Sequence, residues 1–145
     1  VPDLPIQVQC EPPGDFATIQ AEHIDAYRAH HVDPDRARVS QGLVVIPTDS
    51  ATADQIRKYR AYADSRFERT LTPQGPRGLL FSPDLVGPSD ELAERLYEHA
   101  GFQRATEVAF ALPFSFDEPD YLQIVGDLAG QLGPALGWTP AIGTP

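Results

Sequence analysis

The chain has 145 residues, a formal net charge of −10 and a hydrophobic fraction of 41%, which suits one domain around a single core. Such an excess of carboxylates excludes broad binding to nucleic acids or anionic membranes, because both need a basic surface. The single cysteine, Cys10, excludes an internal disulfide, and no apolar run approaches the roughly 20 residues of a membrane span. We therefore expect a soluble, cytoplasmic protein.

The first part of the chain predicts two strands, each followed by a helix. Residues 6–10 alternate between apolar and polar side chains, as in a strand with one buried face. Residues 15–31 carry an apolar stripe at helical spacing. Residues 39–46 predict the best strand, because their LVVI run does not alternate and so indicates burial on both faces. Residues 52–70 follow as a helix that opens with capping-box spacing.

The second part repeats this alternation. Residues 79–81 predict a third strand, and residues 88–101 a helix with Ser89 as its cap and Gly101 as its stop. Residues 107–113 predict a fourth strand. The last predicted helix begins at Asp117 and turns five side chains inward: Tyr121, Leu122, Val125, Leu128 and Leu132.

Strands that alternate with helices imply parallel crossovers. The predicted fold is therefore a single layered α/β domain over residues 1–136, in the order β-α-β-α-β-α-β-α, with a mostly parallel sheet. Residues 137–145 are rich in glycine and proline, and we expect a tail that Trp138 docks onto the domain.

A ten-residue motif lies in the helix after the third predicted strand. Its sequence, AERLYEHAGF at residues 93–102, resembles the C-terminal helix signature of the GNAT acyltransferases. The VIP sequence at residues 45–47 is similar to the end of the central strand of that family. The resemblance covers at most residues 39–112, and it implies a GNAT-like version of the α/β fold.

The resemblance also implies an activity, that of an acyl-CoA-dependent N-acyltransferase. In that family, backbone amides of the central strand receive the thioester carbonyl, and the next helix N-terminus receives the pyrophosphate of the cofactor. The tyrosine of the motif, Tyr97 in this chain, protonates the departing thiolate of coenzyme A. The implied cofactor-binding residues are Val45, Thr48, Ser50, Ala51, Thr52 and Ala53.

The chain departs from the family where the pyrophosphate would bind. GNAT proteins have R/Q-x-x-G-x-G/A there, because glycines let backbone amides approach a phosphate. Residues 48–53 read TDSATA, with no glycine, no arginine and an aspartate that repels phosphate. Two classes of function stay open. One is a degenerate GNAT-like protein that binds acyl-CoA or another small molecule, and the other is a non-catalytic regulator or inhibitor that binds a protein through its acidic surface.

Other polar clusters have two interpretations each. His23, His30 and His31 lie among carboxylates and indicate either a divalent-metal site or a solvated helix end. Cys10 ends the first predicted strand, and its acidic neighbours favour an inert thiol over a reactive one. Residues 57–69 carry five of the 11 Lys and Arg residues, which suits either an ion-paired surface or a site for an anionic ligand.

Overall fold

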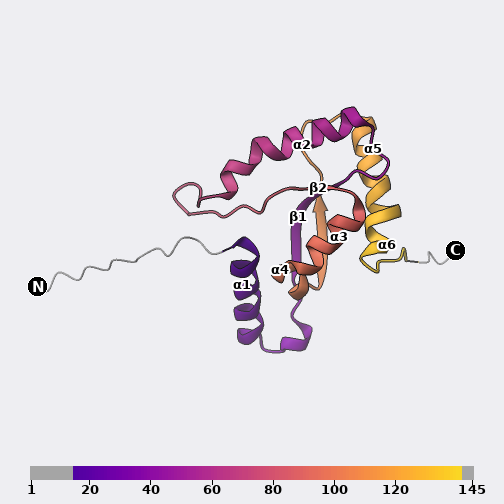
Figure 1. The fold of residues 1–145 in the computed structure, drawn as a ribbon. Coiled ribbons are helices and arrows are strands. Elements are labelled where there is room, and N and C mark those ends of the chain that lie inside the picture. The colour runs from indigo at the N-terminus through magenta and orange to yellow at the C-terminus, as the bar shows by residue number, and fades with distance from the viewer. Residues whose placement is uncertain (1–14, 142–145) are drawn as a thin grey trace, which may run out of the picture.

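The computed structural model describes residues 15–141, and at its centre is a three-stranded sheet with the order β2-β1-β3 (Figure 1). The strands are β1 (Ser40–Pro47), β2 (Leu85–Gly87) and β3 (Glu107–Ala111). Both pairs are parallel: β3 pairs with residues 40–44 of β1, and β2 pairs with residues 45–47. The central strand therefore changes partner along its length. The strand predicted at residues 6–10 lies outside the described residues.

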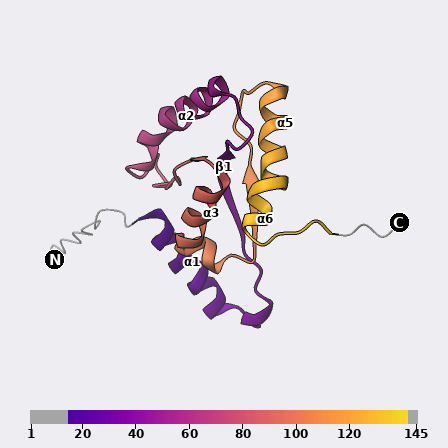
Figure 2. The ribbon, with the colours of Figure 1, turned by 45° about the vertical axis from the view of Figure 1, so that its right-hand side comes forward.

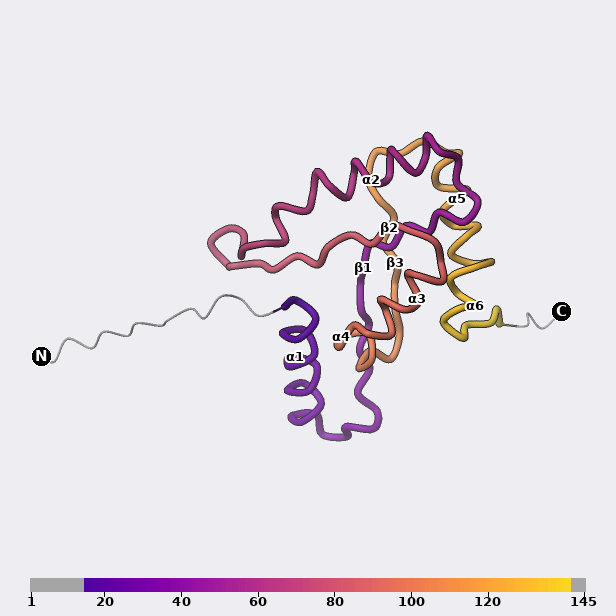
Figure 3. Tube along the Cα trace, in the orientation of Figure 1, coloured from indigo at the N-terminus to yellow at the C-terminus, as the bar shows by residue number. Residues whose placement is uncertain are grey.

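Helices surround this sheet. They are α1 (Phe16–His30), α2 (Ala53–Phe67), α3 (Ser89–Glu98), α4 (Ala100–Arg104), α5 (Glu118–Asp127) and α6 (Gly133–Ala135). A π-helical turn, Leu128–Leu132, joins α5 to α6. Helix α1 lies beside the amino-terminal half of β1, whereas α2 crosses the opposite end and α5 runs down the side of the sheet (Figures 1 and 3). None of the helices within residues 15–141 is long and apolar enough to cross a membrane.

Helices α2 and α3 cover opposite faces of the sheet. Successive residues of a strand point to opposite faces, and the two hydrophobic clusters follow this alternation. Leu43 and Val45 pack with Leu92 and Leu96 of α3. Ile46 packs on the other side with Tyr59 of α2 and with α5. The view in Figure 2 places α3 and α5 on either side of β1. The parallel α/β sheet and the burial of β1 on both faces are confirmed.

The third strand is not where the sequence predicts it. Residues 79–81 were expected to form it, but β2 consists of residues 85–87, and Leu79 only bridges back to Gln74 across a turn. Phe81 instead packs beneath the guanidinium of Arg69, whose Cζ atom lies 4.3 Å from the centroid of the phenylalanine ring. The ion pair between Arg66 and Asp84 holds the chain just before the real strand, with an N–O distance of 2.5 Å. Phe81 therefore packs on the 3₁₀ turn Glu68–Thr70 that follows α2, whereas Leu79 is 55% exposed.

The helix stop predicted at Gly101 is also corrected. Helix α3 already ends at Glu98, and the ring of His99 caps α4 by accepting a hydrogen bond from the amide of Phe102. Gly101 is buried inside α4, where a Cβ atom would collide with the side chain of Gln20 on α1. The glycine permits the close approach of these two helices.

The inward face of the last helix differs from the prediction as well. Leu122 and Val125 are 67% and 49% exposed, whereas Asp120, Ile124 and Asp127 are buried. The side of α5 that meets α2 and β1 is thus largely polar. The search for an apolar stripe cannot find the buried face of such a helix, because that face consists of polar side chains. These side chains can be buried because they form hydrogen bonds with other elements.

The orientation of α5 can be tested by comparing Leu122, which it leaves exposed, with a buried leucine on another helix. Leu96 on α3 is 0% exposed, so Leu96→Ala should lower the free energy of unfolding by about 2–5 kcal/mol. The same change at Leu122 should cost less than about 0.5 kcal/mol, since that side chain is mostly in solvent. Urea denaturation measures both values. Equal losses at the two positions would mean that α5 is rotated about its axis relative to this structure.

Candidate functional site

The candidate site lies beyond the carboxyl ends of β1 and β2. Helix α2 follows β1 on one face of the sheet, and α3 follows the adjacent β2 on the other face. Open α/β sheets bind ligands at such a topological switch point. A cavity of about 650 Å³ occurs at this place, which is within the usual size range of ligand pockets. We refer to it as the switch crevice.

Four segments line the switch crevice: the loop after β1, the start of α2, the start of α3 and the C-terminal helical segment. The loop after β1 contributes Thr48 and Asp49, the start of α3 contributes Ser89 and Asp90, and the C-terminal helical segment contributes Gln131. Apolar surface comes from Ile56, Pro88 and Ala135. The described residues that line the crevice include two carboxylates and no lysine, arginine or histidine.

The N-terminus of α3 already has an acceptor for its exposed donors. The carboxylate of Asp49 accepts hydrogen bonds from the amide of Ser89, at 3.1 Å, and from its hydroxyl, at 2.5 Å. A helix N-terminus attracts anions because its first amides have no partner within the helix. Asp49 fills that position with the protein's own negative charge.

A second carboxylate does the same in the loop that leads into α2. Asp127 is 5% exposed, and it accepts hydrogen bonds from the amide and the hydroxyl of Ser50, both at 2.8 Å. The capping box of Thr52 and Gln55 satisfies further donors at the start of α2. The predicted capping box is confirmed, and the loop that would receive a pyrophosphate in the GNAT interpretation holds a carboxylate.

Thr48 is a wall residue whose side chain has unused hydrogen-bonding capacity. Its amide donates to the carbonyl of Gly87 at 3.0 Å, which ties the ends of β1 and β2 together. The residue is 8% exposed and lines the crevice. Its hydroxyl forms no hydrogen bond within residues 15–141, so it can donate to or accept from a ligand.

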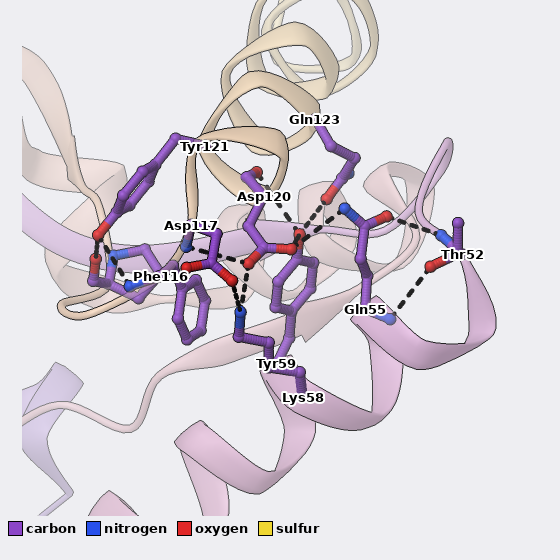
Figure 4. Close-up of polar contacts among 10 residues, drawn as sticks. Thr52, Gln55, Lys58, Tyr59, Phe116, Asp117, Asp120, Tyr121 and Gln123 are labelled. Carbon is purple, nitrogen blue, oxygen red and sulfur yellow. Dashed lines mark hydrogen bonds and ion pairs between the residues drawn. The ribbon is translucent and has the colours of Figure 1, made fainter.

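A network of polar side chains fixes the helices behind the crevice (Figure 4). Asp120 on α5 is 5% exposed and accepts hydrogen bonds from Lys58 and Gln55 of α2. The ammonium of Lys58 holds the pKa of Asp120 below its usual value and outweighs the opposing effect of burial. Tyr59 is 0% exposed. Burial, followed by the nearby charge of Asp120, raises the pKa of its phenol well above the ordinary value.

Gln123 extends this network to the crevice. Its side-chain oxygen accepts from the hydroxyl of Tyr59 at 2.7 Å. Its nitrogen donates to the carbonyl of Pro47 at 3.0 Å and to Asp127 at 2.6 Å. The end of β1 and the carboxylate that receives Ser50 are therefore positioned by the same side chain.

Of the residues that the sequence predicted for cofactor binding, only Thr48 lines the switch crevice. Val45 is buried in β1 and pairs with Leu85 of β2. Ser50 binds Asp127, and the other three residues form the entrance to α2, where Ala51 packs on the core, Thr52 caps the helix and Ala53 is its first residue.

Tyr97, the predicted proton donor, lies at the edge of this region. Its side chain is 51% exposed, and its ring packs edge-on against Phe102. Its hydroxyl donates to the carbonyl of Ala135, a wall residue, at 3.5 Å. Tyr97 is thus a neighbour of the crevice and not part of its lining.

Sequence reasoning missed three of the polar residues at the site. The sequence marks Asp49 only as a residue that repels phosphate and Ser89 only as a helix cap, whereas Pro88 is the N-cap and Ser89 is the first residue of α3. Nothing marked Asp127, which lies 77 residues from its partner Ser50. The pattern D-x-x-Q-x-x-x-D of residues 120–127 places three polar side chains on one helical face, and this is the signal from which the buried face could have been found.

The other sequence candidates do not assemble into sites. His30 and His31 bond locally, to the carbonyl of Ala26 and the amide of Asp33. Within residues 15–141, no group of three or more His, Cys, Asp or Glu side chains is placed to hold a metal. Arg57, Lys58 and Arg66 of α2 pair with carboxylates, which confirms the ion-paired interpretation for these three cations. Cys10 lies outside the described residues.

No family model, curated protein or solved structure matches this chain. The functional argument therefore depends on the geometry of the site.

The Asp120 network makes stability depend on pH. Because the folded pKa of Asp120 lies below its ordinary value, the carboxylate stabilises the fold above that ordinary value, and this contribution is lost as the pH falls through the folded pKa. Asp120→Asn should lower the free energy of unfolding by about 1–3 kcal/mol at pH 7, and the difference from the parent protein should shrink below about pH 4. Glu118→Gln is the control, because Glu118 is exposed and forms no ion pair within residues 15–141. A pH-independent difference for Asp120→Asn would contradict the assigned ion pair.

The exposure of Tyr97 makes a simpler prediction. Tyr97→Phe removes one long hydrogen bond from a half-exposed side chain. The free energy of unfolding should therefore change by less than about 0.5 kcal/mol. Thermal or urea unfolding tests this, and a loss of several kcal/mol would show that the hydroxyl is a structural anchor.

Proposed function

We propose that this domain binds a small organic cation, a primary amine or guanidinium compound, in the switch crevice. The observation that carries this proposal is the charge of the walls. Asp49 and Asp90 face the cavity, and no cationic side chain is among the residues of 15–141 that line it. Two carboxylates at this place favour a positive ligand and oppose a phosphate.

The neutral wall residues suit the same ligand. An ammonium or guanidinium group offers several N–H donors, and the crevice supplies acceptors in the hydroxyl of Thr48 and the amide oxygen of Gln131 as well as in the carboxylates. Ile56 and Ala135 provide apolar surface for a short carbon chain. Pockets that orient small ligands combine apolar walls with a few polar groups in this way.

We propose that the domain binds this ligand without catalysing a reaction. The crevice is lined by Thr, Asp, Ser, Gln and apolar residues, and no His, Cys, Lys or Tyr is among the described residues of its wall. General acid–base catalysis draws most often on histidine, and a serine or threonine nucleophile needs an adjacent base such as histidine to activate it. The domain would then sense or carry its ligand.

An N-acyltransferase that uses acyl-CoA is the second candidate. The proximity of Tyr97 to Ala135 at the crevice edge supports it. The carboxylates of Asp49 and Asp127 at the two helix starts count against it, because a pyrophosphate would have to displace or approach them. We therefore favour the organic cation.

A matched set of four-carbon probes tests the charge preference. Calorimetric titration with 1,4-diaminobutane should show binding, 1,4-butanediol should bind more weakly, and succinate should not bind. The association with the diamine should weaken at high salt, since the carboxylates are partly exposed. Equal binding of the diol and the diamine, or tighter binding of succinate, would contradict the proposal.

The contribution of Asp90 can be isolated. Asp90 is exposed, so Asp90→Asn should leave the fold intact and weaken binding of the diamine about three- to fivefold, as expected for one partly exposed ion pair. Glu94→Gln on the same helix is the control, because Glu94 is exposed and is not among the residues lining the crevice. Equal losses in the two variants would assign the effect to net charge alone.

A further inference from the structure

A second cavity, of about 530 Å³, lies between β3 and the C-terminal helical segment. Phe102, Val108 and Phe110 form one wall, and Val125 of α5 and Trp138 are on the other. The described residues that line it include no charged side chain and none of the residues of the switch crevice. We refer to it as the β3 groove.

The strand beside this groove has an unpaired edge. Strand β3 pairs with β1 on one side, and no strand within residues 15–141 pairs with its other side. Val108 and Phe110 are half-buried and line the groove, whereas Glu107, Ala109 and Ala111 are exposed. The edge of such a strand presents backbone N–H and C=O groups to any extended chain that comes alongside.

The apolar surface continues beyond the strand. Val125 and Trp138, both in the groove wall, are 49% and 50% exposed. Leu112 and Phe114, which follow β3 directly, are 38% and 73% exposed. Exposed apolar side chains in the groove wall and on the segment that follows β3 indicate a surface that another molecule covers.

The charge around the groove restricts which partner fits. Residues 105–145 contain five Asp and Glu residues and no Lys or Arg. Asp120 and Asp127 are buried, Glu107 pairs with Arg38 and Asp117 pairs with Lys58, whereas Glu118 is exposed at the start of α5. A second copy of a chain with a charge of −10 would be repelled, whereas a segment with lysine or arginine beside its apolar residues would be attracted.

We infer that the β3 groove binds an extended, basic segment of a partner protein, which adds as a strand to the outer edge of β3. Alternate side chains of an extended segment point the same way, so every second one enters the groove between Phe110 and Trp138. Main-chain hydrogen bonds to β3 would supply affinity, and the apolar groove would supply selectivity.

The single tryptophan of the chain, Trp138, reports on this binding. The probe is a capped peptide of alternating lysine and valine, eight residues long, titrated into the full chain while Trp138 fluorescence is recorded. The expected result is a saturable blue shift, because the half-exposed indole becomes covered. A peptide of alternating glutamate and valine is the charge-reversed control and should give no shift. An equal response to both peptides would overturn the inference.

A substitution in the groove wall tests whether the peptide binds in the β3 groove. Val125→Lys puts a cation into the groove wall and should weaken binding of the lysine–valine peptide roughly tenfold or more. Val32→Lys is the matched control, since Val32 is 100% exposed and lies outside the groove. Circular dichroism verifies that both variants are folded. Unchanged binding by a folded Val125→Lys variant would overturn the inference.

Two further outcomes would also overturn it. If the chain forms a dimer in sedimentation and Val125→Lys dissociates it, a second copy occupies the groove. If the peptide binds only after residues 1–14 are removed, the chain covers the groove itself. The switch crevice is tested separately, because Asp90→Asn should leave peptide binding unchanged.

Discussion

The burial of two carboxylates on one helix, Asp120 and Asp127, is the constraint on which the site depends. Each needs hydrogen-bond donors, since an unpaired buried charge would be strongly destabilising. Lys58 and Gln55 of α2 satisfy the first, and Ser50 and Gln123 satisfy the second. This requirement fixes where α5 lies against α2 and the end of β1. The π-helical turn and α6 follow from there, and with them Gln131 and Ala135 reach the wall of the switch crevice.

The change of partner along β1 produces both candidate surfaces. Beyond residue 44, β1 pairs with β2 and no longer with β3. Gln123 of α5 bonds to the end of β1 through the carbonyl of Pro47. The C-terminal helical segment therefore has the switch crevice on one side, where it meets α3, and the β3 groove on the other. The walls of the switch crevice are polar and acidic, whereas those of the β3 groove are apolar. We therefore propose a small organic cation for the crevice and an extended peptide segment for the groove.

How much of this the sequence predicts depends on the range of the interactions. The LVVI run and the capping box of α2 are local patterns, and the parallel sheet follows from the alternation of strands and helices along the chain; all three were predicted. The position of β2 was missed because Leu79 and Phe81 are more apolar than the short LVG strand, yet Arg69 and a turn hold them elsewhere. The buried face of α5 was missed because its polar side chains pair across 62 to 77 residues. Thr48 and Asp49 were recognisable as loop residues, but their meeting with Ser89 depends on the packing of two helices.

The central claim is that the protein's own carboxylates occupy the anion positions at the starts of α2 and α3. Calorimetric titration with acetyl-CoA and with free CoA tests it most directly, because both ligands carry a pyrophosphate that needs those positions. We predict no measurable heat and no thermal shift at millimolar ligand. Micromolar binding of either ligand would contradict the claim, since Asp49 and Asp127 would then have to leave the amides they accept from, and it would restore the acyltransferase interpretation with Tyr97 as its proton donor.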